Sequence, residues 1–229
     1  MALASESPPS APDAPRLIHS NASVFIVIEG IEGSGKSTLI AALAHALRGD
    51  GHDVLMTREP GGTPLGDAVR EIFLDRALPI APMTEALLVN AARAQHVSDV
   101  IRPALAVGRL VICDRFTDST LAYQGYGRGL ELEPLRAVCK IAVGDVEPNL
   151  TLLLDTPVSV ARDRLRTRGV ATDRIEREDD AFHERVRRGF LELAESSPRH
   201  RAIDGRLSEK QIFDESLNAV RAAVGARVS

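Results

Sequence analysis

The chain has 229 residues, a formal net charge of -4 at pH 7 and 44% hydrophobic residues, enough for one domain with a core that needs no disulfide or structural metal. The acidic balance gives no support to nucleic-acid binding, and no apolar run approaches the ~20 residues of a membrane span. Cys113 and Cys139 have no metal-ligand or disulfide spacing, so we expect a cytoplasmic protein in which Cys113 is a reduced core residue.

The N-terminal segment differs in composition from the rest of the chain. It is rich in Ala, Ser and Pro, lacks the apolar segment of a signal peptide and is too poor in Arg for an organellar transit peptide. We predict a disordered tail over residues 1–20 and a single domain over residues 21–229.

The domain opens with a strand, a glycine-rich loop and a helix. The β-branched run Val24–Ile28 predicts a buried strand, and the apolar spacing of Thr38–Leu47 predicts a helix. Between them, the pattern G-x-x-x-x-G-K-[ST] predicts backbone N–H groups that converge on a phosphate, Lys36 at the outer phosphates and a Ser37 hydroxyl that ligates Mg²⁺. A turn without function is the alternative, but motif and context agree on a nucleoside triphosphate site. The predicted ATP-binding residues of the loop are Gly30, Ile31, Glu32, Gly33, Ser34, Gly35, Lys36, Ser37 and Thr38.

Four more strand-like runs follow, separated by helical stretches, over residues 54–57, 110–113, 150–154 and, more weakly, 201–204. This alternation predicts an α/β fold in which helices cover both faces of a parallel sheet. Together with the phosphate loop it predicts a three-layer P-loop fold with a five-stranded parallel sheet. Ligands of such sheets bind beyond the carboxyl ends of the strands, so the strand exits should carry the chemistry.

Two strand exits carry arginines. Arg58 follows the second strand beside a Pro-Gly-Gly turn, where a fixed guanidinium would suit an anionic ligand, although the turn alone could be a plain loop. Asp114 ends the third strand, where an aspartate beside a phosphate loop commonly serves Mg²⁺, directly or through water. Arg115 would face the same phosphates, and a structural ion pair between Asp114 and Arg115 is the alternative.

Several segments occur together in one order along the chain. They are the phosphate loop with its internal Glu32, Thr57–Thr63, Glu85 with Arg93–Gln95, Arg102–Leu105, Asp114–Gly129, and Asp155 through the arginine-rich stretch that ends at Arg174–Glu176. In these segments the chain resembles the bacterial thymidylate kinases, nucleoside monophosphate kinases that phosphorylate dTMP to dTDP. The resemblance covers nearly everything from Ser23 to the C-terminal helix.

The resemblance implies an acceptor site for dTMP. Its residues would be Glu32 at the sugar 3′-hydroxyl, Arg58 and Arg115 at the phosphate, Val89, Arg93 at the thymine O4, Ser119 and Thr120 in the base pocket, Tyr123 against the sugar C2′, and Gln124 beside the base. The resemblance also implies a cis Glu59–Pro60 peptide bond and a homodimer, for which the sequence gives no independent signal.

One position departs from the family pattern. Four residues before Arg93, where the family usually has a Phe that stacks on thymine, this chain has Val89. A stacked ring is typically worth ~0.5–1.5 kcal/mol beyond its buried area. Valine would still supply an apolar wall, and Phe73 from another helix could approach the base instead.

Residues 161–180 contain six arginines and six acidic residues, a balance that argues against a nucleic-acid arm. Arg164 and Arg168 are four residues apart and share a helix face before Gly169 ends the helix. A solvated helix face would explain this pattern, but beside a phosphate loop it predicts a lid, over about residues 162–178, that closes over the triphosphate and excludes water. The phosphate loop has no arginine, so the resemblance is to the bacterial design, in which a lid arginine, here Arg168, supplies the catalytic charge.

Phosphoryl transfer needs two anionic reactants held in line and a neutralised transferring group. We therefore predict ATP and dTMP as ligands and Mg²⁺ as the cofactor. The predicted catalytic residues are Lys36, Arg115 and Arg168, the metal-binding residues are Ser37 and Asp114, and Arg164 completes the ATP site.

Two other hypotheses remain open. The chain could phosphorylate another pyrimidine monophosphate or a free deoxynucleoside, and in the second case Glu29 or Glu32 would be the base for a neutral 5′-hydroxyl. It could also be a non-catalytic nucleotide-binding paralogue, which Val89 favours and the retention of Lys36 opposes.

Overall fold

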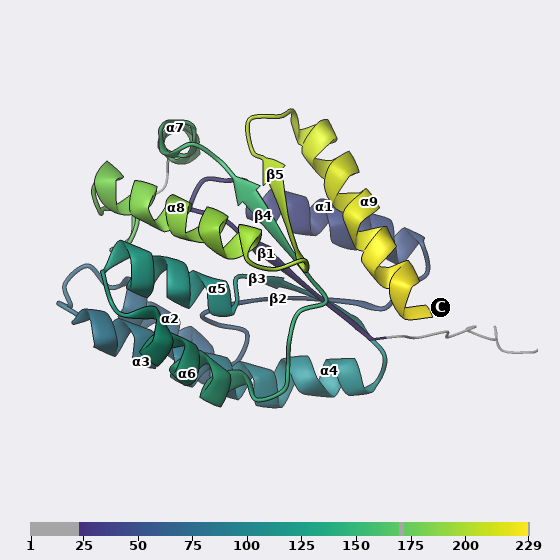
Figure 1. The fold of residues 1–229 in the computed structure, drawn as a ribbon, viewed down its shortest axis with the longest axis horizontal. Helices are drawn as coiled ribbons and strands as arrows, with labels where there is room; N and C mark the ends of the chain where they lie inside the picture. The colour runs from purple at the N-terminus through teal and green to yellow at the C-terminus, as the bar shows by residue number, and fades with distance from the viewer. Residues whose placement is uncertain (1–22, 170–171, 229) are drawn as a thin grey trace, which may run out of the picture.

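The computed structural model describes residues 23–169 and 172–228, which form a five-stranded parallel sheet between layers of helices (Figure 1). The predicted tail over residues 1–20 lies outside the described residues. The strand order is β2–β3–β1–β4–β5, so β1 is the central strand. All five predicted strands are confirmed, each with one further residue in the ladder. They are β1 (Val24–Glu29), β2 (Val54–Arg58), β3 (Leu110–Asp114), β4 (Leu150–Asp155) and β5 (His200–Asp204).

The central strand is buried along its whole length because helices cover both of its faces. Its even-numbered residues pack into a core shared with α1 (Lys36–Gly49) and α9 (Glu209–Val228). Phe25 and Val27 pack into a second core on the opposite face. Strands that are apolar on both faces read as continuous apolar runs, which is why the sequence predicts this element well.

The second face of the sheet is covered by helices from the middle of the chain, which lie on the lower and left-hand side of Figure 1. They are α2 (Pro64–Leu74), α3 (Pro82–His96), the π-helical η1 (Val97–Ile101), α4 (Arg102–Ala106), α5 (Thr117–Thr120), the π-helical η2 (Leu121–Gly127), α6 (Leu132–Val143) and α8 (Asp180–Glu195). With α1 and α9 on the other face, they complete the predicted three layers.

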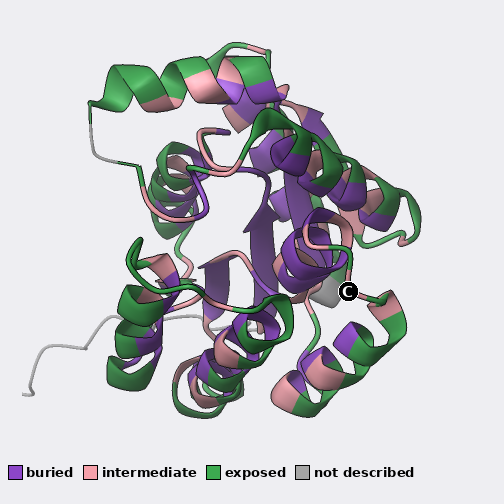
Figure 2. Ribbon diagram, turned by 90° about the vertical axis from the view of Figure 1, so that its left-hand side faces the viewer, coloured by how far each residue is buried: buried purple, intermediate pink, exposed green. Residues whose placement is uncertain are grey.

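Burial follows the layers: the inner strands β3, β1 and β4 are buried, the edge strands β2 and β5 are partly exposed, and the helices expose their outer surfaces (Figure 2). None of the helices in the described part of the chain has the length and apolarity that crossing a membrane requires.

The parallel register brings several strand exits to one edge of the sheet. Asp114 at the end of β3 pairs with Ile28 of β1 on one side and with Arg58 of β2 on the other. The phosphate loop directly follows β1, so these side chains surround its opening. The lid helix α7 (Val158–Arg168) follows β4 and ends, as predicted, at Gly169, whose backbone is left-handed with φ 67°.

Candidate active site

A cavity of about 800 Å³ lies at the carboxyl edge of the sheet. Its lining includes the phosphate loop, α1 and the first turn of α9, and also side chains of α2, α3 and η2. It brings together most of the predicted site residues: Glu32, Gly33, Ser34, Gly35, Lys36, Ser37, Thr38, Arg58, Val89, Arg93, Asp114, Arg115, Ser119, Thr120, Tyr123, Gln124, Arg164 and Arg168. Two predicted loop residues, Gly30 and Ile31, are outside the cavity lining, and Ile31 packs in the core instead.

The phosphate loop needs glycine for two different reasons. Gly33 has φ 79°, and a Cβ there would lie 2.4 Å from the carbonyl oxygen of Ala161 in the lid helix. Gly35 has φ 102° but has no atom within 4 Å of such a Cβ, so only its backbone conformation and the room for a ligand require glycine. The lid helix therefore packs directly on the loop.

Lys36 is buried and turns back onto the loop. Its Nζ donates to the carbonyl oxygens of Gly30 at 2.9 Å and Ile31 at 3.0 Å. Burial and the neighbouring Arg115 lower the pKa of the Lys36 ammonium to about 8, although nearby carboxylates oppose this shift. An anionic phosphate at the loop would favour the charged form, so ligand binding and the charge of Lys36 are linked.

The donor set for Mg²⁺ is present at the predicted place. Asp114 Oδ1 is buried and has no hydrogen-bond partner among the described residues. Ser37 lies on the same cavity, at the start of α1. An unpaired buried carboxylate oxygen and a hydroxyl are the hard oxygen ligands that Mg²⁺ prefers, so these residues fit the ion.

Arg115 is held in an unusual backbone conformation. Its φ is 72°, and no other non-glycine residue in the described part of the chain has a positive φ. Its guanidinium donates to Glu32 at 2.7 Å, to Ser119 at 3.1 Å and to the hydroxyl of Tyr123 at 3.1 Å. Its ion pairs are with Glu32 and Glu29, so the alternative pair with the adjacent Asp114 is not formed.

Sequence analysis missed Arg70, which lines the cavity together with Arg58 and Arg115. Burial and the positive charges of Arg58 and Arg115 lower the pKa of Arg70. A signal was present in the sequence, because Arg70 stands on the face of α2 that also carries Gly66 and Phe73, both buried. An arginine on the core-facing side of a helix beside a phosphate site indicates a ligand.

Arg93 is fixed from several sides. Its guanidinium donates to Glu59 at 2.6 Å, to Asn90 at 2.6 Å, to Thr120 at 2.9 Å and to the carbonyl oxygen of Phe116 at 2.8 Å. Only about one of its five N–H groups is left for a ligand. The predicted cis Glu59–Pro60 bond is confirmed.

A group of metal-ligand type lies next to Arg93 but does not fit a metal. Glu59, His96 and Cys113 place ligand atoms within 4.8 Å of one another. Glu59, however, already binds Arg93 and accepts from His96 Nδ1 at 2.9 Å. Burial raises the pKa of the Cys113 thiol well above its usual value, so this group stays protonated and is a poor ligand.

Glu32 and Tyr123 form the part of the lining where the sugar is expected. The Tyr123 hydroxyl donates to Glu32 at 2.7 Å. Burial opposes the charge of Glu32, but Arg115 and Lys36 outweigh it and lower the pKa of this carboxyl. Glu32 is therefore an anion that would accept a hydrogen bond from a hydroxyl group.

The sequence left open whether Phe73 takes the place of the stacking ring that is absent at Val89, and the apolar wall near Arg93 contains both residues. Phe73 and Val89 are buried, belong to one core cluster and both line the cavity. Phe73 comes from α2 and Val89 from α3. A phenyl ring is therefore present in this pocket, although it comes from a different helix than in the family pattern.

The two lid arginines hold different positions. Arg164 donates to the carbonyl oxygens of Ser34 at 3.2 Å and Gly205 at 3.0 Å, and so joins the lid helix to the phosphate loop and to the end of β5. Arg168 is half-exposed and donates to Glu176 at 2.8 Å.

Sequence analysis also missed the wall opposite the lid. Leu39 and Ala42 of α1 and Ile212 and Phe213 of α9 line the cavity beside the phosphate loop. They offer the apolar surface that a flat nucleobase requires. No local motif marks them, because α9 is distant from the loop in sequence.

The comparisons with known proteins agree with this geometry. A family model described as thymidylate kinase matches residues 28–215. A thymidylate kinase of Desulfovibrio desulfuricans is 49% identical over 212 residues, 89% of this chain and 98% of that protein, and one of Geobacter sulfurreducens is 53% identical over 188 residues, 79% of this chain and 88% of that protein. The crystal structure of thymidylate kinase from Ehrlichia chaffeensis has a TM-score of 0.70 and 33% identity, and covers 87% of this chain and 99% of its own.

We predict that kcat/KM for ATP falls as the pH rises through about 8. The lowered pKa of Lys36 means that the free enzyme loses this positive charge above about pH 8 and with it an attraction for the phosphates. Initial rates at low concentrations of both ATP and dTMP, from about pH 7 to about pH 9.5, measure the fall. The control is Lys36→Arg, whose guanidinium stays charged and should move the fall to higher pH. A flat profile for the unmodified protein would contradict this role of Lys36.

Proposed function

This chain belongs to the thymidylate kinase family, and on that basis we propose that its cavity holds ATP against the phosphate loop and dTMP against α2, α3 and η2. The enzyme transfers the γ-phosphoryl group of ATP to dTMP, giving dTDP and ADP, a step in dTTP synthesis. The observation that carries the site assignment is the convergence of Arg58, Arg70 and Arg115 on one cavity next to Lys36. Four cations on one cavity attract an anionic ligand, because its charge reduces their mutual repulsion.

Arg58, Arg70 and Arg115 would bind the phosphate of dTMP. Guanidinium groups bind phosphate through paired N–H donors, and three of them around one dianion would fix the direction from which it attacks. The acceptor is already an anionic nucleophile, so the reaction needs no strong general base. The Glu32 carboxylate would accept from the sugar 3′-hydroxyl, and the Tyr123 ring would lie against the sugar.

Arg93 and Gln124 would recognise the thymine edge. Arg93 has one N–H group left and cannot rotate, because Glu59 and Thr120 hold it. Ser119 and Thr120 complete the polar part of the pocket, and Phe73 and Val89 would form its apolar wall. A fixed donor facing O4 would favour a pyrimidine with a 4-oxo group over cytosine, whose 4-amino group cannot accept.

Ser37 and Asp114 would hold Mg²⁺, which when bound neutralises charge on the β- and γ-phosphates. Lys36 would leave the carbonyl oxygens of the loop for the same phosphates. Arg168 would supply the charge that develops in the transition state, because the phosphate loop itself has no arginine. Arg164 would keep the lid helix on the loop, so that water is excluded during transfer.

The structure gives no support to a nucleoside kinase that uses Glu29 as a base. Glu29 is buried outside the cavity lining, and its carboxylate accepts from the backbone N–H of Phe116 at 2.8 Å and from the hydroxyl of Ser119 at 2.7 Å. Burial, only partly opposed by Arg115, raises the pKa of Glu29 to about 7. We assign Glu29 to the support of the loop after β3.

We propose a cytoplasmic homodimer formed through α2 and α3. These helices pack on each other and expose large apolar side chains that no other element of the described chain covers: Leu65, Ile72, Met83 and Leu87. Leu65 and Ile72 are seven residues apart and Met83 and Leu87 four, so each pair forms a stripe along its helix. Two copies of this face would bury both stripes.

The substrate assignment is tested by ATP consumption with Mg²⁺ and a set of acceptors. We expect turnover with dTMP, weaker turnover with dUMP, and little with CMP, AMP or thymidine. The preference over dUMP should be modest, because one buried methyl group contributes only ~1 kcal/mol. Equal or better turnover of CMP or AMP would contradict the assignment.

We predict that Val89→Phe weakens dTMP binding. Phe73 already occupies this wall, so a second ring would overpack the pocket at a cost of ~1–3 kcal/mol, about fivefold or more in Kd. Calorimetric titration with dTMP measures the effect. In a Phe73→Ala background the added ring should instead restore affinity. Tighter dTMP binding by the single variant Val89→Phe would show that the pocket lacks a stacking ring.

We predict that Leu87→Glu converts the dimer to a monomer, because it would bury an unpaired charge in the apolar face that the two copies share. Light scattering should give about twice 24.7 kDa for the unmodified protein and 24.7 kDa for the variant. Val107→Glu is the control, since Val107 is exposed and apolar but lies at the end of α4. A monomeric unmodified protein would contradict the dimer.

A further inference from the structure

We propose that Glu85 is a positioning residue that links recognition of the base to the placement of the lid arginine Arg168. Glu85 lies on α3 and its side chain is fully buried, yet it belongs to no part of the cavity lining. Three side chains converge on its carboxylate: Gln124 from η2, Arg128 from the loop after η2, and Arg174 from the lid. The inference rests on the roles proposed above for Gln124 and Arg168.

The first link joins Glu85 to the base pocket. Glu85 Oε2 accepts from Gln124 Nε2 at 3.1 Å, and Arg128 donates to both oxygens at 3.0 and 3.2 Å. A carboxylate only accepts, so this contact settles which end of the Gln124 amide faces Glu85. The Oε1 atom and the second N–H of Gln124 are thereby directed to other partners, such as a pyrimidine edge.

The second link joins Glu85 to the lid. Arg174 donates to Glu85 Oε1, and its Nε donates to the carbonyl oxygen of Phe73 at 2.9 Å. The guanidinium also lies over the Phe73 ring, 5.1 Å from its centroid, and the backbone N–H of Arg174 donates to the carbonyl oxygen of Leu74 at 3.3 Å. Four contacts thus fasten the returning segment of the lid to the wall of the base pocket.

The third link runs from this anchor to Arg168 through a hydrogen-bonded turn. Asp173 Oδ1 accepts from the backbone N–H groups of Ile175 at 2.9 Å and Glu176 at 2.8 Å, and the N–H of Asp173 donates to Glu176 Oε2 at 3.1 Å. The other oxygen of Glu176 accepts from Arg168 at 2.8 Å. The turn that holds Arg168 is therefore the turn that Arg174 anchors.

These links give an acceptor base a route to the catalytic charge. A base that engages Gln124 stabilises the orientation of Glu85, Glu85 fixes Arg174, and the turn fixes Arg168. Selection of the base would then be expressed in kcat as well as in binding.

The test removes the contact between Glu85 and the lid and keeps the contacts of Glu85 with Gln124 and Arg128. Arg174→Met keeps an apolar stem against Phe73 and leaves Glu85 paired with Arg128. We expect kcat to fall about tenfold while the KM for dTMP changes by less than about twofold. In an Arg168→Ala background, Arg174→Met should cause no further loss of kcat. Losses that multiply in the double variant, or a raised KM with unchanged kcat, would overturn the inference.

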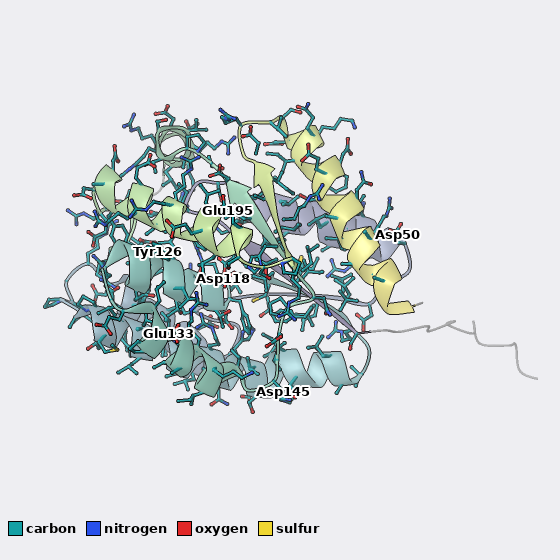
Figure 3. All side chains as sticks on the ribbon, viewed as in Figure 1. Asp50, Asp118, Tyr126, Glu133, Asp145 and Glu195 are labelled. Carbon is teal, nitrogen blue, oxygen red and sulfur yellow. The ribbon has the colours of Figure 1, made fainter. Side chains whose placement is uncertain are left out.

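Two further variants separate this inference from the roles on which it rests. Glu85→Gln, which touches both links, should raise the KM for dTMP and lower kcat, with the kcat effect again absent when Arg168 is Ala. Asp50→Asn is the control, because it breaks a bidentate pair with Arg221 at the C-terminal end of α1, on the right-hand side of the molecule in Figure 3. It should leave both constants unchanged, and melting temperatures exclude a loss of folding.

The outcomes are distinguishable. If Arg168→Ala lowers kcat and Arg174→Met does not, the link through Glu85 is wrong and the catalytic role of Arg168 stands. If Arg168→Ala leaves kcat unchanged, the proposed role of Arg168 is wrong, and the inference falls with it.

Discussion

The repulsion among Arg58, Arg70 and Arg115 is the constraint on which the site depends. Burial and the positive charges of Arg58 and Arg115 lower the pKa of Arg70, so the folded protein holds a cluster of cations that an anionic ligand would stabilise. The fold maintains it by several means. The strand register sets Arg58 beside the β3 exit, and Glu32 pairs with Arg115. Catalytic sites commonly store such preorganised charge, because a group that is already in place needs no reorganisation during the reaction.

The two ends of the cavity differ in how many contacts hold their charged side chains. At the base end, Arg93 is buried and bound on several sides, and Glu85 is clamped between two arginines. At the donor end, Arg168 is half-exposed and pairs with one carboxylate, that of Glu176, among the residues that the structure describes. An acceptor pocket with many contacts and a lightly held charge at the donor end suit an enzyme that must recognise one small base and also bind a common triphosphate.

The sequence predicted those parts of the site whose structure depends on residues that are close together in the chain. Strand β1 alternates between two apolar cores and the phosphate loop sits at its exit, so strand, loop and helix could be predicted together. Arg58 and Arg115 could be predicted because they follow strands at the edge where ligands bind. The end of the lid helix at Gly169 could also be predicted, because glycine readily adopts the left-handed backbone conformation that ends a helix.

The rest of the site depends on how the helices pack against one another, and no local sequence pattern predicts that packing. Arg70 was missed because its role follows from the placement of α2 over the cavity. Phe213 and Ile212 come from the last helix and meet the phosphate loop only in three dimensions. Likewise, the sequence left open whether Phe73 replaces the aromatic ring absent at Val89, since that depends on the packing of α2 against α3.

The most direct test of this account is calorimetric titration of the protein with dTMP and with thymidine, which differ only in the phosphate. The account predicts that dTMP binds at least about 100-fold more tightly, and that Arg70→Met removes about tenfold of this difference without changing the affinity for thymidine. Similar affinities for the two ligands, or an Arg70→Met variant that weakens both equally, would contradict an acceptor site built around an anionic phosphate.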